Sequence, residues 1–395
     1  MKEFIDFSDN FKPEGPEGKV KVELFDDLTG RKIEEIETNN FIAKGMDYLY
    51  HLAMISAFTD DRYTGGFNAY DAFNDPFQYM ILTDASHPED PKNEWLVKGR
   101  TIGFAFTTPY SGGDIYQGSY NAVESFTNRE QVHIVIDFPT HAANGTFQSI
   151  YFLSYHNVFN ENDVFDKPFG EIRSIQKYNG YFYVLGYGGN YFMRYDGNFN
   201  KLDEWELKYR GSEYNRDFVI YDGNIYFANY DTYYIARGIR KVPLSKPDSE
   251  DIEPVYDDEL CYGITHDGRY FYVSNYTYDT IMQFDNNFNI VEIYEPKIYN
   301  GDVISGQLHV DTDGTIILNR DIWNQTYVWD RGNNLTYTGG IDLKGFIDDD
   351  KIIGNYDQLV PKKGISSRVL LDSPVTKTSN NTMKITYDFM LPSFM

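Results

Sequence analysis

The sequence predicts a mainly β protein, in which a β-rich N-terminal domain with one helix is followed by a five-bladed β-propeller. Three observations predict this fold. Strand-like segments recur along the chain and are separated by Asp-Gly and Asn-Gly pairs, which are typical of tight turns. Tyrosine and phenylalanine, at 35 and 29 of the 395 residues, favour strands. From about residue 165 the turn-and-strand pattern repeats at a nearly constant interval.

The first region, residues 1–158, is expected to be a separate β-rich domain. Residues 19–43 contain two alternating segments around an Asp-Asp-Leu-Thr-Gly turn, which predicts a hairpin. A helix is expected near 41–56, because apolar residues recur there on one helical face. Further strands are expected over 78–83, 100–107, 131–138 and 147–154.

The second region, residues 159–362, carries the repeat that predicts the propeller. A strand is expected just after each of Gly180, Gly223, Gly268 and Gly314, which lie 43, 45 and 46 residues apart. A weaker fifth copy begins at Lys351. A four-stranded unit repeated about every 40–45 residues is a propeller blade. The alternative is an irregular β-sandwich with chance spacing.

The C-terminal segment, residues 363–395, does not fit the blade pattern. Asp372-Ser373-Pro374 followed by Asn380-Asn381 resembles Asp137-Phe138-Pro139 followed by Asn144-Gly145, so a strand–loop–strand hairpin is expected. This hairpin either returns to the first domain, which makes the propeller an insertion, or closes the propeller ring.

Charge and cysteine content exclude several classes of partner and site. The 60 acidic and 35 basic residues give a net charge of −25, which argues against nucleic acid and anionic membranes as partners. The single Cys261 excludes a disulfide framework and a cysteine-based zinc site. The seven histidines show no metal-ligand spacing, so neither a metal nor a cofactor is expected. No signal peptide and no membrane-spanning segment are expected either.

No nucleotide-binding or hydrolase motif is present, and the protein is expected not to be an enzyme. The alternative is a glycan hydrolase of propeller fold, in which carboxylates from successive blades face the central channel. The acids placed to do so are Asp217, Asp258, Glu259 and Asp302, which are expected to be ordinary turn residues just before the innermost strands.

The candidate binding site is the set of aromatic and polar loops that follow the second strand of each blade. Loops at the same blade position lie on one face of a propeller, and tyrosine, tryptophan, asparagine and aspartate together suit sugar rings and hydroxyls. The alternative is that these loops cap the blades and contact a neighbouring subunit. The predicted ligand-binding residues are Tyr187, Asn190, Tyr230, Asp231, Tyr276, Tyr278, Asp279, Asp321 and Trp323.

Parts of the sequence resemble virion tail proteins of tailed phages that infect Gram-positive bacteria. The resemblance covers roughly residues 20–155 and 365–390. It depends on short sequence segments rather than on a catalytic motif. These segments are Val22-Glu23-Leu24-Phe25 with Asn40-Phe41-Ile42-Ala43-Lys44-Gly45; Gln131-Val132-His133-Ile134-Val135-Ile136-Asp137-Phe138-Pro139 with Asn144-Gly145-Thr146-Phe147; and Pro374-Val375-Thr376-Lys377-Thr378 with Asn381-Thr382-Met383-Lys384.

The resemblance implies a tail-fibre or baseplate protein, since staphylococcal members of that group carry propeller domains, including five-bladed ones. It implies a homotrimer that assembles in the host cytoplasm, attaches to other tail or baseplate proteins by the N-terminal domain, and contacts host cell-wall teichoic acid or polysaccharide. The chain departs from the pattern in lacking a long heptad stem, which puts in doubt whether it is the primary receptor binder or a secondary fibre. A purely structural connector without a ligand is a further alternative.

Overall fold

The computed structural model of the protein is built almost entirely of β-strands; within the part of the chain that it describes, the exception is a short 3-10 helix, η3 (Ser212–Tyr214). Most of the helix predicted near 41–56 lies outside that part, and residues 41 and 42 end a strand instead. The described residues are 17–42, 77–90, 94–127, 131–153, 166–230, 237–250, 252–257, 259–302, 305–320, 325–339, 342–354, 357–362 and 365–390.

The chain forms two compact units. The first comprises Met1–Trp95, Thr101–Ser154 and Ile365–Met395, and the second comprises Leu96–Arg100 and Tyr155–Gly364. The short segment Leu96–Arg100 belongs with the second unit, although it lies inside the predicted first region. It is held there by a hydrogen bond of 2.8 Å from the Val97 amide to Oγ1 of Thr338.

The first unit is a ten-stranded antiparallel sheet with the order β4-β3-β8-β28-β2-β1-β29-β7-β5, and β6 pairs with β7. The predicted hairpin is confirmed as β1 and β2, and the other strands predicted in this region are β3, β4, β7 and β8. The bounds are β1 (Glu17–Asp26), β2 (Lys32–Ile42), β3 (Tyr79–Thr83), β4 (Thr101–Phe106), β5 (Ser119–Tyr120), β6 (Phe126–Thr127), β7 (Gln131–Phe138), β8 (Gly145–Leu153), β28 (Ser367–Lys377) and β29 (Asn381–Met390).

The two halves of this sheet pack face to face. β2 joins β28 through only its last two residues, so the strand order has a natural break there. The rings of Phe152 on β8 and Tyr387 on β29 lie 4.3 Å apart, although these strands are not hydrogen-bonded neighbours. Alternate residues of β29 are buried, as expected for a strand with one face on a core. The first unit is therefore a β-sandwich with one shared apolar core.

The C-terminal strands belong to the first unit. β29 lies between β1 and β7, while β28 pairs with β8. Of the two alternatives for this segment, the return to the first domain is therefore the one observed, and closure of the propeller ring by it is wrong. The second unit is inserted between β8 and β28.

The second unit contains five small antiparallel sheets in succession along the chain, which define a β-propeller. The strands predicted after each turn glycine are confirmed as β10, β14, β18 and β22, and the fifth copy is β26. The bounds are β9 (Ile172–Tyr178), β10 (Tyr181–Gly186), β11 (Tyr191–Tyr195) and β12 (Lys201–Glu206); β13 (Asn215–Tyr221), β14 (Asn224–Asn229), β15 (Gly238–Pro243) and β16 (Glu253–Tyr256); β17 (Cys261–His266), β18 (Phe271–Asn275), β19 (Thr280–Phe284) and β20 (Ile290–Tyr294); β21 (Gln307–Val310), β22 (Ile316–Arg320), β23 (Gln325–Trp329) and β24 (Leu335–Gly339); and β25 (Gly345–Phe346), β26 (Lys351–Ile353) and β27 (Leu359–Pro361).

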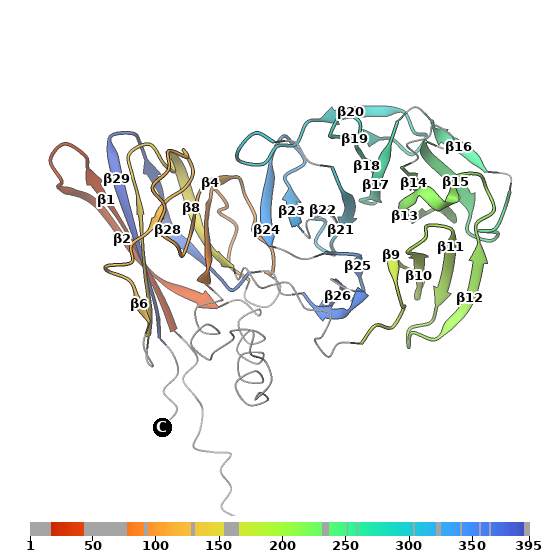
Figure 1. Cartoon of the computed structure of the whole chain (residues 1–395), viewed down its shortest axis with the longest axis horizontal. Helices are drawn as coiled ribbons and strands as arrows, with labels where there is room; N and C mark the ends of the chain where they lie inside the picture. The colour runs from red at the N-terminus through yellow and green to blue at the C-terminus, as the bar shows by residue number, and fades with distance from the viewer. Residues whose placement is uncertain are drawn as a thin grey trace, which may run out of the picture. The chain divides into compact units, whose positions relative to one another are not determined.

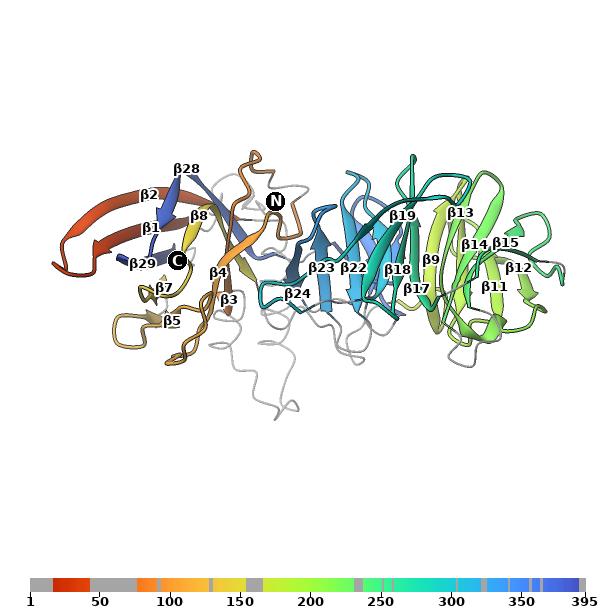
Figure 2. The ribbon, with the colours of Figure 1, turned by 90° about the horizontal axis from the view of Figure 1, so that it is seen from above.

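The first strand of each sheet is the innermost one. Figure 1 shows these sheets of the second unit arranged around a common centre, and Figure 2 shows their strands running side by side. Neighbouring inner strands approach closely, since a Cβ added to Gly263 on β17 would lie 2.5 Å from the carbonyl oxygen of Gly306. The Ile175 amide on β9 donates to the Lys344 carbonyl just before β25 at 3.0 Å. The count of five blades around the ring remains a prediction.

Two kinds of tight turn recur in the propeller. Asn179 and Gly180, like Asp222 and Gly223, have positive φ, which the two-residue hairpin turns require. In the second kind, between the third and fourth strands, an aspartate side chain accepts hydrogen bonds from the amide and the side chain of an asparagine four residues later. The three pairs are Asp196 with Asn200, Asp285 with Asn289, and Asp330 with Asn334.

Candidate functional site

The predicted tyrosines occupy equivalent positions at the end of the second strand in three sheets. The amides of Tyr187, Tyr230 and Tyr276 each donate to the carbonyl of the residue just before their sheet's innermost strand, at 3.3, 3.0 and 2.9 Å. Tyr187 and Tyr276 are 66% and 42% exposed, so both rings are open to solvent. The fold therefore presents these aromatic side chains at matching points of one propeller face.

Two of the predicted residues lie in direct contact. The rings of Tyr230 and Tyr276 form an edge-to-face pair with centroids 4.9 Å apart. Burial, followed by the hydrogen bond with Tyr276, raises the pKa of Tyr230. Tyr262, which was not predicted, completes the group, since its ring lies 5.6 Å from Tyr230 and 6.2 Å from Tyr276. We call these three residues the tyrosine cluster.

Two arginines place their guanidinium groups over tyrosine rings of this face. The guanidinium of Arg216 lies 5.3 Å from the centroid of the Tyr230 ring and 5.8 Å from that of Tyr262. The guanidinium of Arg173 lies 5.6 Å from the Tyr187 ring and donates to the Tyr187 carbonyl. Both are cation–π geometries. This face therefore carries two guanidinium groups, on a chain whose net charge is −25.

The inner strands explain why these arginines meet the tyrosines. Residues at the start of an innermost strand pair with residues at the end of the second strand, as in the pairs of Asn215 with Asn229 and of Cys261 with Asn275. Arg173, Arg216 and Tyr262 each stand second in their innermost strand. They lie outside the loops that the sequence predicts as the binding site, although the pairing of the first two strands places them beside those loops.

The asparagines that precede two of the tyrosines are structural. Asn229 is fully buried, and its side-chain amide donates to the Gly211 carbonyl at 2.7 Å and to Oδ1 of Asn215 at 3.2 Å. The side-chain oxygen of buried Asn275 accepts from the Thr277 amide at 2.8 Å. In an Asn-Tyr pair, the asparagine thus fixes the loop and the tyrosine is left to face outward.

The remaining predicted residues have separate positions. Tyr278 is 65% exposed and precedes Asp279, which has positive φ in its turn. The carbonyl of Asn190 accepts from the Leu207 amide at 2.8 Å. Asp231, Asp321 and Trp323 lie outside the described residues.

A single carboxylate ties the inner strands together at the propeller axis. Asp217 on β13 is 1% exposed, and its Oδ1 accepts from Oγ of Ser174 at 2.6 Å and from the Phe218 amide at 2.9 Å. Its Oδ2 accepts from the amides of Ile264 at 3.1 Å and Leu308 at 3.4 Å. Burial raises the pKa of Asp217 to about 7, and the hydrogen bonds oppose that rise. The side chain joins β9, β13, β17 and β21.

The four acids considered for a hydrolase do not share one environment. Asp217 lies within its strand rather than before it, and it is closed off from solvent. Asp302 is exposed, and its amide and carboxylate bond to the side chain of Asn300 in a turn, at 3.0 and 2.8 Å. Glu259 precedes β17, and Asp258 lies outside the described residues. The part of the chain that the structure describes contains no group of three potential metal ligands and no helix able to cross a membrane.

The strand order and the axial contacts define the second unit as a β-propeller with an aromatic, arginine-bearing face. No protein-family model matches the chain, and no curated protein sequence matches it either. Similar solved structures include virginiamycin B lyase from Staphylococcus aureus, with 11% identity, 72% of this chain and 84% of that chain covered, and a TM-score of 0.33.

Two further similar structures are equally distant. Glutaminyl cyclase from Myxococcus xanthus shares 10% identity over 53% of this chain and 92% of its own, with a TM-score of 0.37. An auxiliary nutrient binding protein from Bacteroides ovatus shares 9% identity over 65% of this chain and 95% of its own, with a TM-score of 0.36. The propeller assignment therefore depends on the strand order of this chain itself.

Proposed function

We propose that the protein is a tail-fibre or baseplate component of a phage virion, a homotrimer whose propeller contacts host cell-wall glycopolymer during adsorption. The observation that carries the proposal is the tyrosine cluster with Arg216 above it, beside the exposed Tyr187 with Arg173. Aromatic faces pack against the C–H surfaces of sugars, and guanidinium groups pair with phosphate oxygens. This combination suits a polymer of sugars or polyols linked by phosphate, such as teichoic acid.

The local charge of this face supports a phosphate-containing ligand. The net charge of −25 repels polyanions at long range, but that repulsion is screened within about 8 Å at physiological salt. At contact distance Arg216 and Arg173 hold guanidinium groups 5.3 and 5.6 Å from the rings of Tyr230 and Tyr187. Binding should therefore be weak at a single site and gain strength from repeated sites on a trimer and on the particle.

We expect the double substitution Tyr230→Ala with Tyr276→Ala to weaken binding of the protein to host cell walls by roughly 30-fold. Each aromatic contact contributes about 1 kcal/mol, and a tenfold change in affinity corresponds to about 1.4 kcal/mol. Binding is measured by sedimentation of purified protein with host walls, before and after extraction of teichoic acid. Wild-type binding should fall on extraction to the level of the double variant.

Tyr181→Ala is the matched control for this experiment. Tyr181 is also exposed and also has a guanidinium above its ring, that of Arg194, but it lies at the opposite end of its sheet. Its replacement should leave wall binding unchanged. If the double variant binds walls as the wild type does while remaining folded, the tyrosine cluster only caps the blades and the proposed adhesion is wrong.

We further propose that the first unit attaches the protein to the particle. The strands of this unit pair with one another, apart from the segment Leu96–Arg100, which bonds to Thr338 of the second unit. The Ser366 amide donates to the Phe152 carbonyl at 2.7 Å, next to the two points where the insertion begins and ends. Removing residues 155–364 and joining residues 154 and 365 through two glycines should therefore close a hairpin between β8 and β28. Deleting residues 1–158 would instead leave β28 and β29 without their partner strands.

The shortened protein should be found in purified virions at the wild-type amount, and these virions should not adsorb to host cells. Incorporation is measured by quantitative mass spectrometry of particles from a phage that carries the deletion. A folded first unit that is absent from the particles would contradict the assignment of attachment to this unit.

A further inference from the structure

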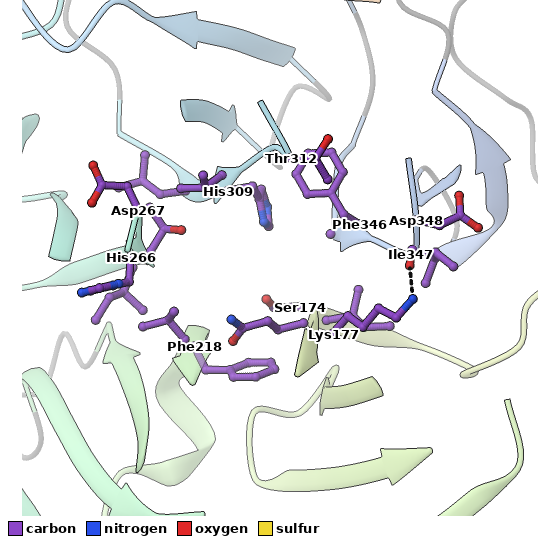
Figure 3. A pocket seen from close by; sticks show the side chains of 18 of the residues that line it. Ser174, Lys177, Phe218, His266, Asp267, His309, Thr312, Phe346, Ile347 and Asp348 are labelled. Atoms are coloured by element: carbon purple, nitrogen blue, oxygen red, sulfur yellow. Dashed lines mark hydrogen bonds between the residues drawn. The ribbon is translucent and has the colours of Figure 1, made fainter. Parts of the chain in front are cut away.

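A cavity of about 560 Å³ opens at the other end of the innermost strands from the tyrosine cluster. Its walls come from the second halves of β9 and β17, from the middle of β13, from β21 with the turn after it, and from β25 with the turn that follows. Tyr262 of the tyrosine cluster and the neighbouring Arg216 stand instead at the starts of their strands. The cavity is therefore a separate feature of the propeller, and Figure 3 shows its lining side chains.

The side chain that distinguishes this cavity is His309 on β21. It is 7% exposed, and Figure 3 shows its ring pointing into the cavity. One ring nitrogen hydrogen-bonds to the backbone of Leu343, whereas Nε2 is buried and has no hydrogen-bond partner among the described residues. A buried polar atom without a partner is costly, so such an atom on a cavity wall indicates a missing ligand group.

The surroundings of His309 determine what that group must be. Burial lowers the pKa of His309 to about 4, so the ring is neutral near pH 7. The Leu343 bond raises this pKa, which identifies Leu343 as the acceptor, through its carbonyl. The bonded nitrogen therefore carries the proton, and Nε2 presents a lone pair. The cavity needs a donor such as a hydroxyl group.

The rest of the lining combines apolar and polar groups. Phe346 contributes a ring and buried Thr265 contributes a hydroxyl group, whereas the Phe218 ring packs against Phe192 and Phe227 in the core. Among the charged residues of the lining, Asp267, Asp348 and Asp349 outnumber Lys177, so anions are disfavoured there. Aromatic faces suit the C–H surface of a sugar or polyol, and the hydroxyls of such a compound supply the donors.

We propose that this cavity is a second binding site, for a neutral polyhydroxy compound of monosaccharide or polyol size, one of whose hydroxyl groups donates to Nε2 of His309. The volume falls within the range of about 300–1,000 Å³ that is typical of small-molecule sites. The site is independent of wall adhesion by the tyrosine cluster, because it shares no side chain with that cluster.

The test uses the full-length protein with ¹⁵N-labelled histidine, and N-acetylglucosamine, glucose and ribitol as probes. The Nε2 resonance of His309 is identified by its loss in His309→Phe, which keeps a ring of similar size but removes the acceptor. At least one probe should shift this resonance saturably. Calorimetry with that probe should show at least a tenfold weaker affinity for His309→Phe.

Two control variants make the result specific. His133→Phe instead replaces a histidine of the first unit, which lies outside the lining and stacks its ring on Phe126 at 4.8 Å, so binding should be retained. Tyr230→Ala with Tyr276→Ala should also bind the probe normally, which separates this site from the proposed adhesion.

Thr312→Trp provides a second route if His309→Phe does not fold. Thr312 is an exposed residue of the lining, and a bulky ring there narrows the cavity without changing His309. The same loss of affinity is expected. The proposal is overturned if none of the three probes shifts the His309 resonance, or if the substituted proteins bind the active probe as tightly as the wild type.

Discussion

Asp217→Asn should destabilise the propeller by about 3 kcal/mol, because the substitution replaces an acceptor of four hydrogen bonds by a group that also donates. In one orientation of the new side-chain amide, its nitrogen would face the backbone amides of Ile264 and Leu308, both of which are donors. In the other orientation the nitrogen would face the donating amide of Phe218. Either way, at least one buried backbone donor loses its acceptor.

The effect is best measured by hydrogen exchange at the amides of Ile264 and Leu308, because these report on the axis of the second unit alone. Exchange should accelerate by roughly 100-fold in the variant, as a loss of about 3 kcal/mol requires. Asp222→Asn is the matched control, since Asp222 is exposed in the turn that follows the same strand and its positive φ is tolerated by asparagine. Equal exchange in both variants and the wild type would show that Asp217 does not tie the inner strands.

The pH dependence gives a second readout for Asp217. Burial raises its pKa in the folded protein to about 7 from the ordinary value of 3.8. The folded state therefore binds the proton more tightly than the unfolded chain, and this stabilisation is complete below about 3.8 and is lost as the pH rises through 7. The free energy of unfolding of the wild-type propeller should therefore decrease as the pH rises from about 3.8 through 7. In Asp217→Asn this decrease should be absent.

The propeller could be predicted from sequence because each sheet carries its own local signal. A turn such as Asn179-Gly180 needs positive φ within two residues, so its sequence requirement is the same in every repeat. The same holds for the tyrosines, since a fixed offset from the turn places them at equivalent points of one face. The regular spacing of the turns therefore predicted both the fold and part of the candidate site.

Contacts between residues that are far apart in the sequence could not be predicted from such local signals. The sequence predicts Asp217 to be a turn residue, because nothing within β13 shows that Ser174, Ile264 and Leu308 converge on it. His309 has no metal-ligand spacing in the sequence that would mark it as a site residue, yet the fold buries it on a cavity wall. The bonding partners of Asp217 on other strands lie 43 or more residues away along the chain, which no local pattern contains.

The same limit applies to the first unit, where a buried ion pair joins segments far apart in the sequence. Arg368 on β28 is fully buried and donates to both carboxylate oxygens of Glu94, at 2.8 and 2.9 Å. His87 also bonds to Glu94, at 2.8 Å, and Ser149 accepts from the guanidinium at 3.0 Å. Burial by itself raises the pKa of Glu94, but the bond from His87 and the charge of Arg368 outweigh burial and hold that pKa below its usual value.

Arg368→Met should therefore destabilise the first unit by about 3–5 kcal/mol, because it leaves a buried carboxylate without its charged partner. The measurement is hydrogen exchange of the β8 and β28 amides, which pair with each other in this unit. Lys384→Met is the control, since Lys384 pairs with the half-exposed Glu124 on the same unit's surface and its loss should cost less than about 1 kcal/mol.

Adding Glu94→Leu to Arg368→Met should restore most of the lost stability, because a buried ion pair replaced by apolar side chains of similar size is often neutral. Acidification should also destabilise the first unit of the wild-type protein, as Arg368→Met does. The pKa of Glu94 is lower in the folded protein, so its contribution is present above the ordinary value of 4.5 and is lost as the pH falls through the folded value. If the double variant is as unstable as Arg368→Met, the guanidinium acts through its packing and its bonds to Ser149 and the His87 carbonyl rather than through the charge of Glu94.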